Sequence, residues 1–162
     1  MSTTGYLSLK GVELAFKKWK ESDPNLKGYG FGQIFNQNGQ PKQEQVYPQM
    51  WVSPGQQQPI IGNQGMLTIN RTFQILFFDI KLSDGSNENQ VISDCEEFAM
   101  RFIRWVMNAN DEIDVVQSPI ITPFTDKFLD DVAGVMVDFV IQFNGNNDEC
   151  DDPNVTTNIN FI

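Results

Sequence analysis

The segment Met66–Leu82 constrains the fold more than any other part of this chain. Its apolar residues alternate with polar ones and then change phase, so that two interleaved apolar sets follow each other. The first set comprises Leu67, Ile69, Phe73, Ile75 and Phe77, and the second comprises Leu76, Phe78, Ile80 and Leu82. Alternation predicts a β-strand, and the change of phase predicts either a β-bulge or a section buried on both faces. At 17 residues the segment exceeds the usual strand length, which suggests a strand that leaves its own domain and pairs with a neighbouring subunit.

The residues after this strand predict a helix and two further strands. Val91–Met107 has the period of an amphipathic helix, with acidic residues early and basic residues late, as the helix dipole favours. Its apolar stripe consists of Val91, Cys95, Phe98, Ala99, Phe102 and Val106. We then expect a short strand at Ile113–Ser118 and a last core strand at Gly134–Phe143. Between them, Pro119–Asp131 contains two prolines, and its stretch Asp126–Asp131 is expected to be a turn or loop.

The N-terminal third predicts one helix, two short strands and a long loop. Leu7–Glu21 has apolar residues near helical spacing and ends before Pro24, because the residue preceding a proline avoids helical geometry. We expect strands at Phe31–Phe35 and Val46–Val52. Ser53–Gly65 contains two prolines and three glycines and is interpreted as an exposed loop.

This order of elements predicts an α+β fold, with an antiparallel β-sheet packed by two helices, long loops and a C-terminal extension. Residues 1–145 are expected to form a single domain, and residues 146–162 an arm that is acidic at first and β-prone at its end. A β-prone terminal segment can add a strand to the sheet of a neighbour.

Composition and charge narrow the class of protein. The chain has 162 residues, enough for one domain, and its net charge is −10. An acidic surface repels phosphate backbones and argues against binding of nucleic acid. No apolar run approaches the ~20 residues that span a bilayer, and the first ten residues lack the pattern of a secretory signal. We therefore expect a soluble protein that is made in the cytoplasm and has no membrane partner.

The residues that carry chemistry are scarce. The chain has no histidine, which removes the commonest general base and the commonest metal ligand. Gly28, Gly30 and Gly32 do not follow a strand and open a helix, so we interpret them as a flexible turn rather than a phosphate-binding loop. The acidic cluster around Asp148 lacks the spacing of a calcium loop, and Cys95 is expected to be a small buried apolar residue. We predict that the chain is not an enzyme and has no catalytic, cofactor-binding or metal-binding residues.

Four residues are candidates for contacts with other proteins. Ile60 and Ile61 form an apolar pair inside the polar segment Ser53–Gly65, which suggests that something packs on them. Trp51 lies on a strand that we expect at the edge of the sheet, where an aromatic residue is either an interface anchor or part of the core. Phe161 lies in the β-prone end of the C-terminal arm.

The order of elements also resembles a known family. The chain begins with an N-terminal helix, strands near Val46–Val52 and a Pro/Gly loop. A long strand ending in FFDIKL, the helix VISDCEEFAMRFIRWVMN, the stretch IDVVQSPIITPFTD and the closing strand GVMVDFVIQF follow. This order, over roughly residues 5–152, resembles the tail-completion or tail-terminator proteins of tailed bacteriophages and the related neck proteins of the head-tail connector. The polar surface and the sequence CDDPN are similar to forms from phages of gut Bacteroidetes, including the crAss-like group.

The resemblance implies a structural virion protein. Its subunits would form a ring of six or twelve identical copies, stacked on the portal or on adjacent neck or tail ring proteins. DNA would pass through the ring without specific binding, and the protein would be located in the neck or tail of the virion after synthesis in the host cytoplasm. The resemblance supplies no catalytic residues.

Two other hypotheses remain beside this one. The first is a small acidic binding module, such as a phage-encoded inhibitor or adaptor of a host protein, since high acidity can mimic DNA and the pair Ile60–Ile61 is available for contact. The second is an enzyme that uses a pair of carboxylates. It ranks last because the carboxylates cluster in segments expected to be solvated loops.

Overall fold

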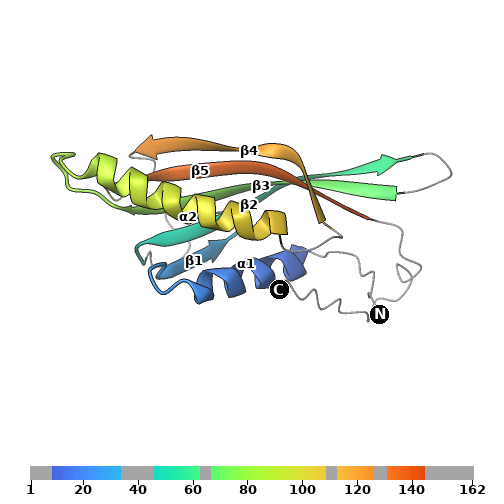
Figure 1. Cartoon of the computed structure of the whole chain (residues 1–162), viewed down its shortest axis with the longest axis horizontal. Coiled ribbons are helices and arrows are strands. Elements are labelled where there is room, and N and C mark those ends of the chain that lie inside the picture. The colour runs from blue at the N-terminus through green and yellow to red at the C-terminus, as the bar shows by residue number, and fades with distance from the viewer. Residues whose placement is uncertain (1–8, 34–45, 63–66, 109–112, 126–130, 145–162) are drawn as a thin grey trace.

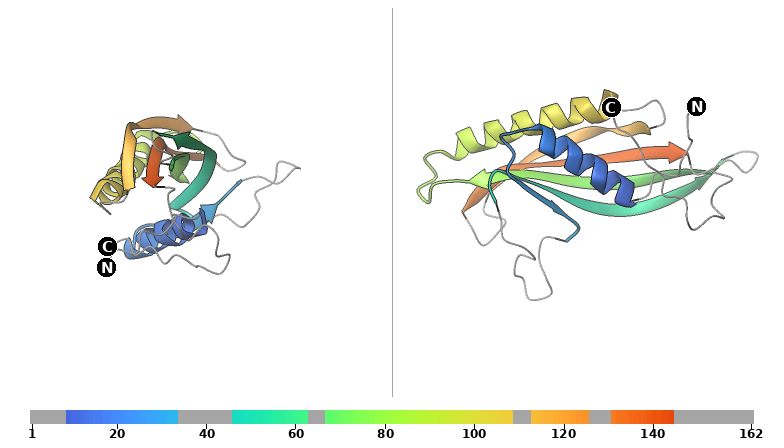
Figure 2. Two further views of the ribbon diagram at one scale, coloured as in Figure 1. Left: turned by 90° about the vertical axis from the view of Figure 1, so that its right-hand side faces the viewer. Right: turned by 90° about the horizontal axis from the view of Figure 1, so that it is seen from below.

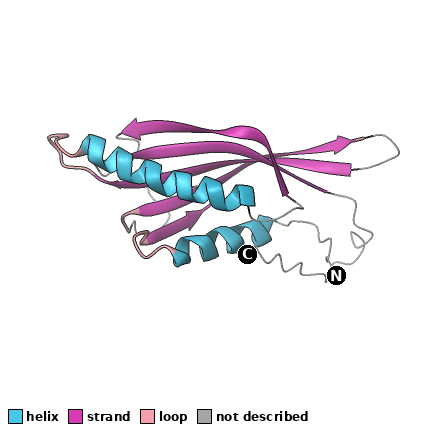
Figure 3. Cartoon of the chain, viewed as in Figure 1, coloured by secondary structure: helices cyan, strands magenta, loops and turns pink. Residues whose placement is uncertain are grey.

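The computed structural model describes residues 9–33, 46–62, 67–108, 113–125 and 131–144 (Figures 1 and 3). The two helices are α1 (Leu9–Ser22) and α2 (Glu88–Asn108), and the five strands are β1 (Gly28–Phe31), β2 (Gln49–Ile61), β3 (Leu67–Ile80), β4 (Ile113–Thr125) and β5 (Val132–Asn144). The α+β class is confirmed, and both predicted helices are present with small shifts of their ends. The C-terminal arm, residues 146–162, lies outside the described residues.

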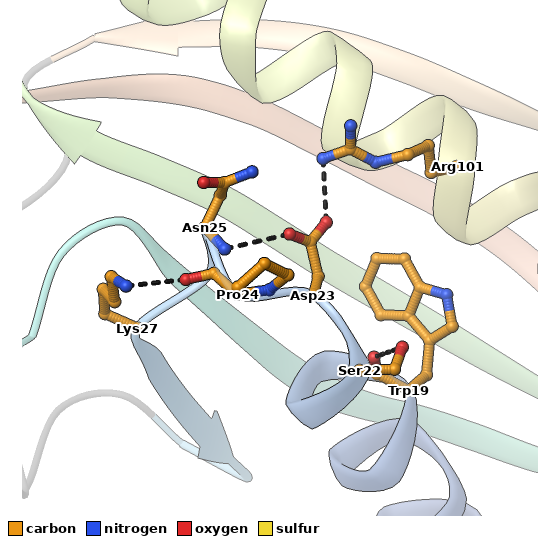
Figure 4. A network of polar contacts seen from close by, with 7 residues as sticks. All are labelled: Trp19, Ser22, Asp23, Pro24, Asn25, Lys27 and Arg101. Atoms are coloured by element: carbon orange, nitrogen blue, oxygen red, sulfur yellow. Dashed lines mark hydrogen bonds and ion pairs between the residues drawn. The ribbon is translucent and has the colours of Figure 1, made fainter.

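The strands form one sheet in the order β1-β2-β3-β5-β4. Three neighbouring pairs are antiparallel, whereas β1 pairs with β2 in parallel, so the sheet is not antiparallel throughout. Figure 2 shows both helices on one face of this sheet, as the sequence predicts. The polar contacts in Figure 4 connect them, because Arg101 of α2 forms an ion pair of 2.8 Å with Asp23, which directly follows α1.

The predicted long strand lies in the centre of the sheet. β3 pairs with β5 from Thr68 to Ile80 and with β2 on its other edge. The hypothesis that it pairs with a neighbouring subunit is therefore wrong, because both of its edges are occupied within the chain. The change of apolar phase reflects burial on both faces, since every residue from Ile75 to Phe78 is buried. The bulge lies in the partner strand, between Pro54 and Gln57 of β2.

The prolines caused the main errors of the sequence analysis. Residues 53–61 are the outer half of β2, not a loop, because Pro54 stands at the bulge and no described strand pairs with the other edge of this half. A proline on an unpaired edge removes no ladder hydrogen bond. The same holds for β4, an edge strand with two register shifts that continues to Thr125 instead of ending at Ser118. The strand expected at Phe31–Phe35 occurs earlier, at Gly28–Phe31, and Ile34 and Phe35 lie outside the described residues.

The main core lies between the helices and the sheet. Phe102 of α2 is fully buried at its centre. Five aromatic rings surround it, with centroid separations of 5.0 Å to Trp19, 5.1 Å to Phe16, 5.7 Å to Trp105, and 6.0 Å to both Phe77 and Phe139. Aromatic pairs at such distances add stabilisation beyond the apolar area that they bury. Phe102 thereby joins α1, α2, β3 and β5.

A smaller core covers part of the opposite face of the sheet. It consists of Trp51, Leu76, Phe78, Phe124 and Val132, with Tyr47 and Met136 partly buried beside them. Trp51 lies over Gly30 of β1, where an added Cβ would come within 2.0 Å of the indole ring. The indole Nε1 donates a hydrogen bond of 2.8 Å to the carbonyl oxygen of Gly32, whose φ is +96°. The glycines interpreted as a flexible turn thus form β1 and its end, and Gly30 makes room for Trp51.

We expect Phe102→Ala to lower the free energy of unfolding by about 3–5 kcal/mol, because it leaves a large cavity in the aromatic centre of the core. Met107→Ala, on the same helix but 65% exposed, is the matched control and should change it by less than about 0.5 kcal/mol. Urea unfolding followed by circular dichroism measures both. Similar losses for the two variants would contradict the assignment of Phe102 to the centre of the core.

Gln49 provides a second test, of opposite sign. Its side chain is fully buried, and neither its amide nitrogen nor its amide oxygen has a hydrogen-bond partner among the residues that the structure describes. We expect Gln49→Met to raise the free energy of unfolding by about 1–3 kcal/mol, because a buried amide without partners costs its desolvation free energy. Gln58→Met, at an exposed position of the same strand, should leave stability nearly unchanged. A loss of stability in Gln49→Met would show that the amide is satisfied.

Candidate interaction surfaces

The outer ends of β2 and β3 form a projecting hairpin. Residues Gln57–Ile61 pair with Leu67–Arg71, and Figure 1 shows this end of the two strands extending past the helices. Every β2 residue from Gly55 to Ile61 is exposed. Ile61 is 80% exposed and Ile60 37%, so the hairpin presents apolar side chains that it does not bury in its own chain.

Polar side chains stabilise the hairpin internally. Arg71 Nη2 donates a hydrogen bond to Gln57 Oε1 across the two strands. Next to the bulge, the hydroxyl of Thr72 donates to the carbonyl oxygen of Gln56 at 3.3 Å. On the other edge of β2, no described strand pairs with residues 53–61. Pro54 and Pro59 lie on that edge, and prolines there disfavour unwanted strand pairing.

An open depression of about 350 Å³, lined by both apolar and polar residues, lies beside the bulge on the face opposite the helices. Its lining includes Ser53, Gly55, Thr72, Gln74, Gln117 and Asp138. Within it, Gln74 Nε2 donates a hydrogen bond of 3.0 Å to Asp138 Oδ1, from β3 to β5. Four residues further along β3, Gln142 Nε2 donates to Asn70 Oδ1 at 2.9 Å. This face is therefore apolar around Trp51 and polar towards the hairpin.

The outer faces of the helices carry opposite charges. α1 contains four lysines and two glutamates, whereas α2 contains four acidic residues and two arginines. The net charges of the two helices are thus +2 and −2, although the whole chain has −10. Exposed apolar residues lie on each helix, Leu14 on α1 at 58% exposure and Met100 and Met107 on α2 at 44% and 65%.

The titratable groups inside the fold are unreactive ones. Burial, together with the charges of Asp79 and Asp94, raises the pKa of Cys95 to about 12. A thiol with so high a pKa is a poor nucleophile. Burial and the charge of Glu13 raise the pKa of Tyr29, whose hydroxyl donates a hydrogen bond of 3.1 Å to the carbonyl oxygen of Glu13.

No group of three or more cysteine, aspartate and glutamate side chains within the described ranges could share a metal ion. Among the same residues, no helix is long and apolar enough to cross a membrane.

The structure separates the four predicted interface residues. Ile60 and Ile61 are exposed at the end of the hairpin. Trp51 is only 2% exposed and lies on an inner strand, so core packing is the correct one of its two alternatives. Phe161 lies outside the described residues. The charged helix faces were not among the predicted sites, although the spacing of Lys10, Lys17 and Lys18 on one helical face could have indicated them.

No known protein-family model matches this sequence, and a search of curated proteins finds no significant match.

Asp79 predicts a dependence of stability on pH. Burial raises the pKa of its carboxyl above the ordinary value of 3.8, opposed by a hydrogen bond from the backbone N–H of Ile80 and reinforced by the charge of Asp94. The folded state therefore holds the proton more tightly than the unfolded state, and stability falls as the pH rises from 3.8 through the raised pKa. We expect Asp79→Asn to be more stable than the wild type at pH 7, with the difference vanishing in acid below 3.8.

Asp84→Asn is the control for this test. A hydrogen bond from the backbone N–H of Ser86 lowers the pKa of the Asp84 carboxyl. This carboxylate therefore stabilises the fold above its unfolded pKa, and its replacement should produce a small loss at pH 7, opposite in sign to Asp79→Asn. Thermal unfolding of the three proteins between pH 3 and 7 measures both effects. The same sign for the two variants would contradict the assigned environments.

Proposed function

We propose that this chain is a structural subunit of a homo-oligomeric ring in the head-tail connector or at the tail end of a tailed phage. The ring would join portal, neck and tail around the DNA channel. The observation that carries the proposal is the β2–β3 hairpin, whose exposed apolar end has no function in the core of its own chain.

The geometry of the hairpin supports an assembly role. Seven consecutive exposed residues, Gly55–Ile61, span about 20 Å at the rise of a β-strand. The exposed side chains of this segment contribute little stabilisation through burial within their own chain. Ile61 would bury several times more apolar surface on contact with another subunit. A rigid arm fixed to a central strand can reach a neighbour without costly ordering on binding.

The remaining support comes from charge and element order. A net charge of −10 suits a ring whose channel must let DNA pass without binding it. The order α-β-β-β-α-β-β is the arrangement on which the resemblance to tail-terminator and neck proteins rests. In this proposal the partners are other copies of the chain, six or twelve in the ring, and the adjacent portal, neck or tail rings. The protein is then a virion component and not an enzyme.

The alternative is a small acidic binding module that acts on a host protein. The exposed pair Ile60–Ile61 favours it as well, because the same apolar end could anchor an inhibitor or adaptor. The two functions differ in where the protein is found. A ring subunit is present in every purified virion of the phage that encodes it, whereas an inhibitor is absent from virions and competes with DNA for its host target.

The test of the ring is mass photometry and negative-stain electron microscopy of the purified protein. We expect closed rings for the wild type and at least tenfold weaker assembly for Ile61→Asp, because the change places a charge in an apolar contact. Ile80→Asp, the same substitution at the far end of β3 where Ile80 is 52% exposed, is the control and should assemble normally. Circular dichroism checks that both variants fold.

If the Ile61→Asp variant assembles into rings as well as the wild type does, the hairpin is not part of the contact between subunits. A protein that is monomeric and also missing from purified virions would contradict the proposed function.

A further inference from the structure

The outer face of α1 is basic and has an apolar centre. Lys10, Leu14, Lys17 and Lys18 recur at the spacing of a single helical face, and all four are exposed. None of the three lysines forms a hydrogen bond or an ion pair with another described residue. Four of the chain's eleven basic residues lie in this one helix.

The outer face of α2 has the complementary character. It carries an open depression of about 380 Å³, which is lined by Ser93, Glu96, Glu97, Met100, Arg101 and Arg104. Glu96 and Glu97 are exposed and have no ion-pair partner among the described residues. Arg101 is already engaged, because it pairs with Asp23 at 2.8 Å and lies 5.0 Å from the centre of the Phe98 ring. Arg104 also lines the depression and is exposed, so the two glutamates exceed the one remaining arginine by a single negative charge.

The two faces belong to one layer of the fold. Figures 1 and 2 show α1 and α2 side by side on the same face of the sheet. The ring centroid of Trp105 in α2 lies 6.1 Å from that of Phe16 and 6.2 Å from that of Trp19, both in α1. A head-to-tail contact that places α1 of one copy over α2 of the next can repeat around a ring, because each copy then offers one basic and one acidic helix face. Two chains that each carry −10 repel one another in general, and α1 provides the surface where that repulsion is weakest.

We infer that a second copy of this chain docks on the helix layer, with Leu14 among the lysines of one α1 packed beside Met100 among the glutamates of the other α2. The inference rests on the proposed self-assembly and names a subunit contact separate from the hairpin. Because the charges at this contact are exposed, the association should weaken as the salt concentration rises and the Debye length shortens.

The test uses two reversed variants, Lys17→Glu/Lys18→Glu and Glu96→Lys/Glu97→Lys. Both residue types favour helices, so the fold should be retained. Each Lys→Glu change alters the net charge by −2 and each Glu→Lys change by +2, so from −10 the variants reach −14 and −6. We expect each variant alone to show at least tenfold weaker self-association through this contact in sedimentation velocity at low salt.

The two reversed variants should recover association when they are mixed, because an acidic α1 then faces a basic α2 and the reverse. The mixture should associate more strongly than the −6 variant alone, and net charge cannot explain that order, because two −6 chains repel each other less than a −14 chain repels a −6 chain. A chain that carries all four substitutions should associate within about threefold of the wild type. Circular dichroism confirms that each variant is folded.

The outcomes separate this inference from the proposed function. Reversed variants that assemble like the wild type, or a mixture that remains unassociated, would overturn the helix contact while leaving rings and virion incorporation to be judged on their own. A wild type that stays monomeric at all salt concentrations, with a mixture that also stays monomeric, overturns the contact. The presence of the protein in virions then decides the proposed function independently.

Discussion

The burial of β3 on both faces is the constraint on which the rest of the structure depends. Ile75 and Phe77 contribute to the core beneath the helices, while Leu76 and Phe78 pack around or beside Trp51 on the opposite face. A strand with apolar side chains on both faces must be covered on both, and its central position also requires a neighbour on each edge. The helix layer covers one face of β3, and the Trp51 cluster covers the other. β2 and β5 pair with its two edges.

The parts of the fold that sequence analysis predicted are those with local periodicity. α2 and β3 repeat their apolar residues at 3.6 and 2 residues, so each could be identified without its neighbours. The outer half of β2 could not be identified in this way. Pro54 and Pro59 are compatible with a strand only at a bulge or on an edge that has no paired neighbour. That information lies in the pairing of strands, not in the segment itself.

The candidate surfaces divide in the same way. The apolar pair Ile60–Ile61 stands out against its polar neighbours, so its exposure could be anticipated. The burial of Trp51 could not, because it depends on Gly30, about twenty residues earlier, being aligned with it in the parallel pair β1–β2. The opposite charges of α1 and α2 indicate a candidate contact surface only once the two helices are known to lie on the same face of the sheet.

The helices and the hairpin point to different sides of the protein, which suits a subunit that has several neighbours at once. A monomeric binder or a two-fold dimer needs one contact surface, whereas a subunit of a ring with more than two copies needs two different ones.

The continuity of β3 gives the hairpin a mechanical property. The strand runs without a register shift against β5 from Thr68, near the exposed end, to Ile80, beyond both cores. A load applied at Ile61 is therefore carried along hydrogen-bonded backbone to Phe77 and from there to the ring of Phe102. The single shift in register against β2, between Pro54 and Gln57, is where the ladder along this path is interrupted. We therefore expect the hairpin to bend at the bulge more readily than elsewhere, and a force on its end to reach the helix layer through β3.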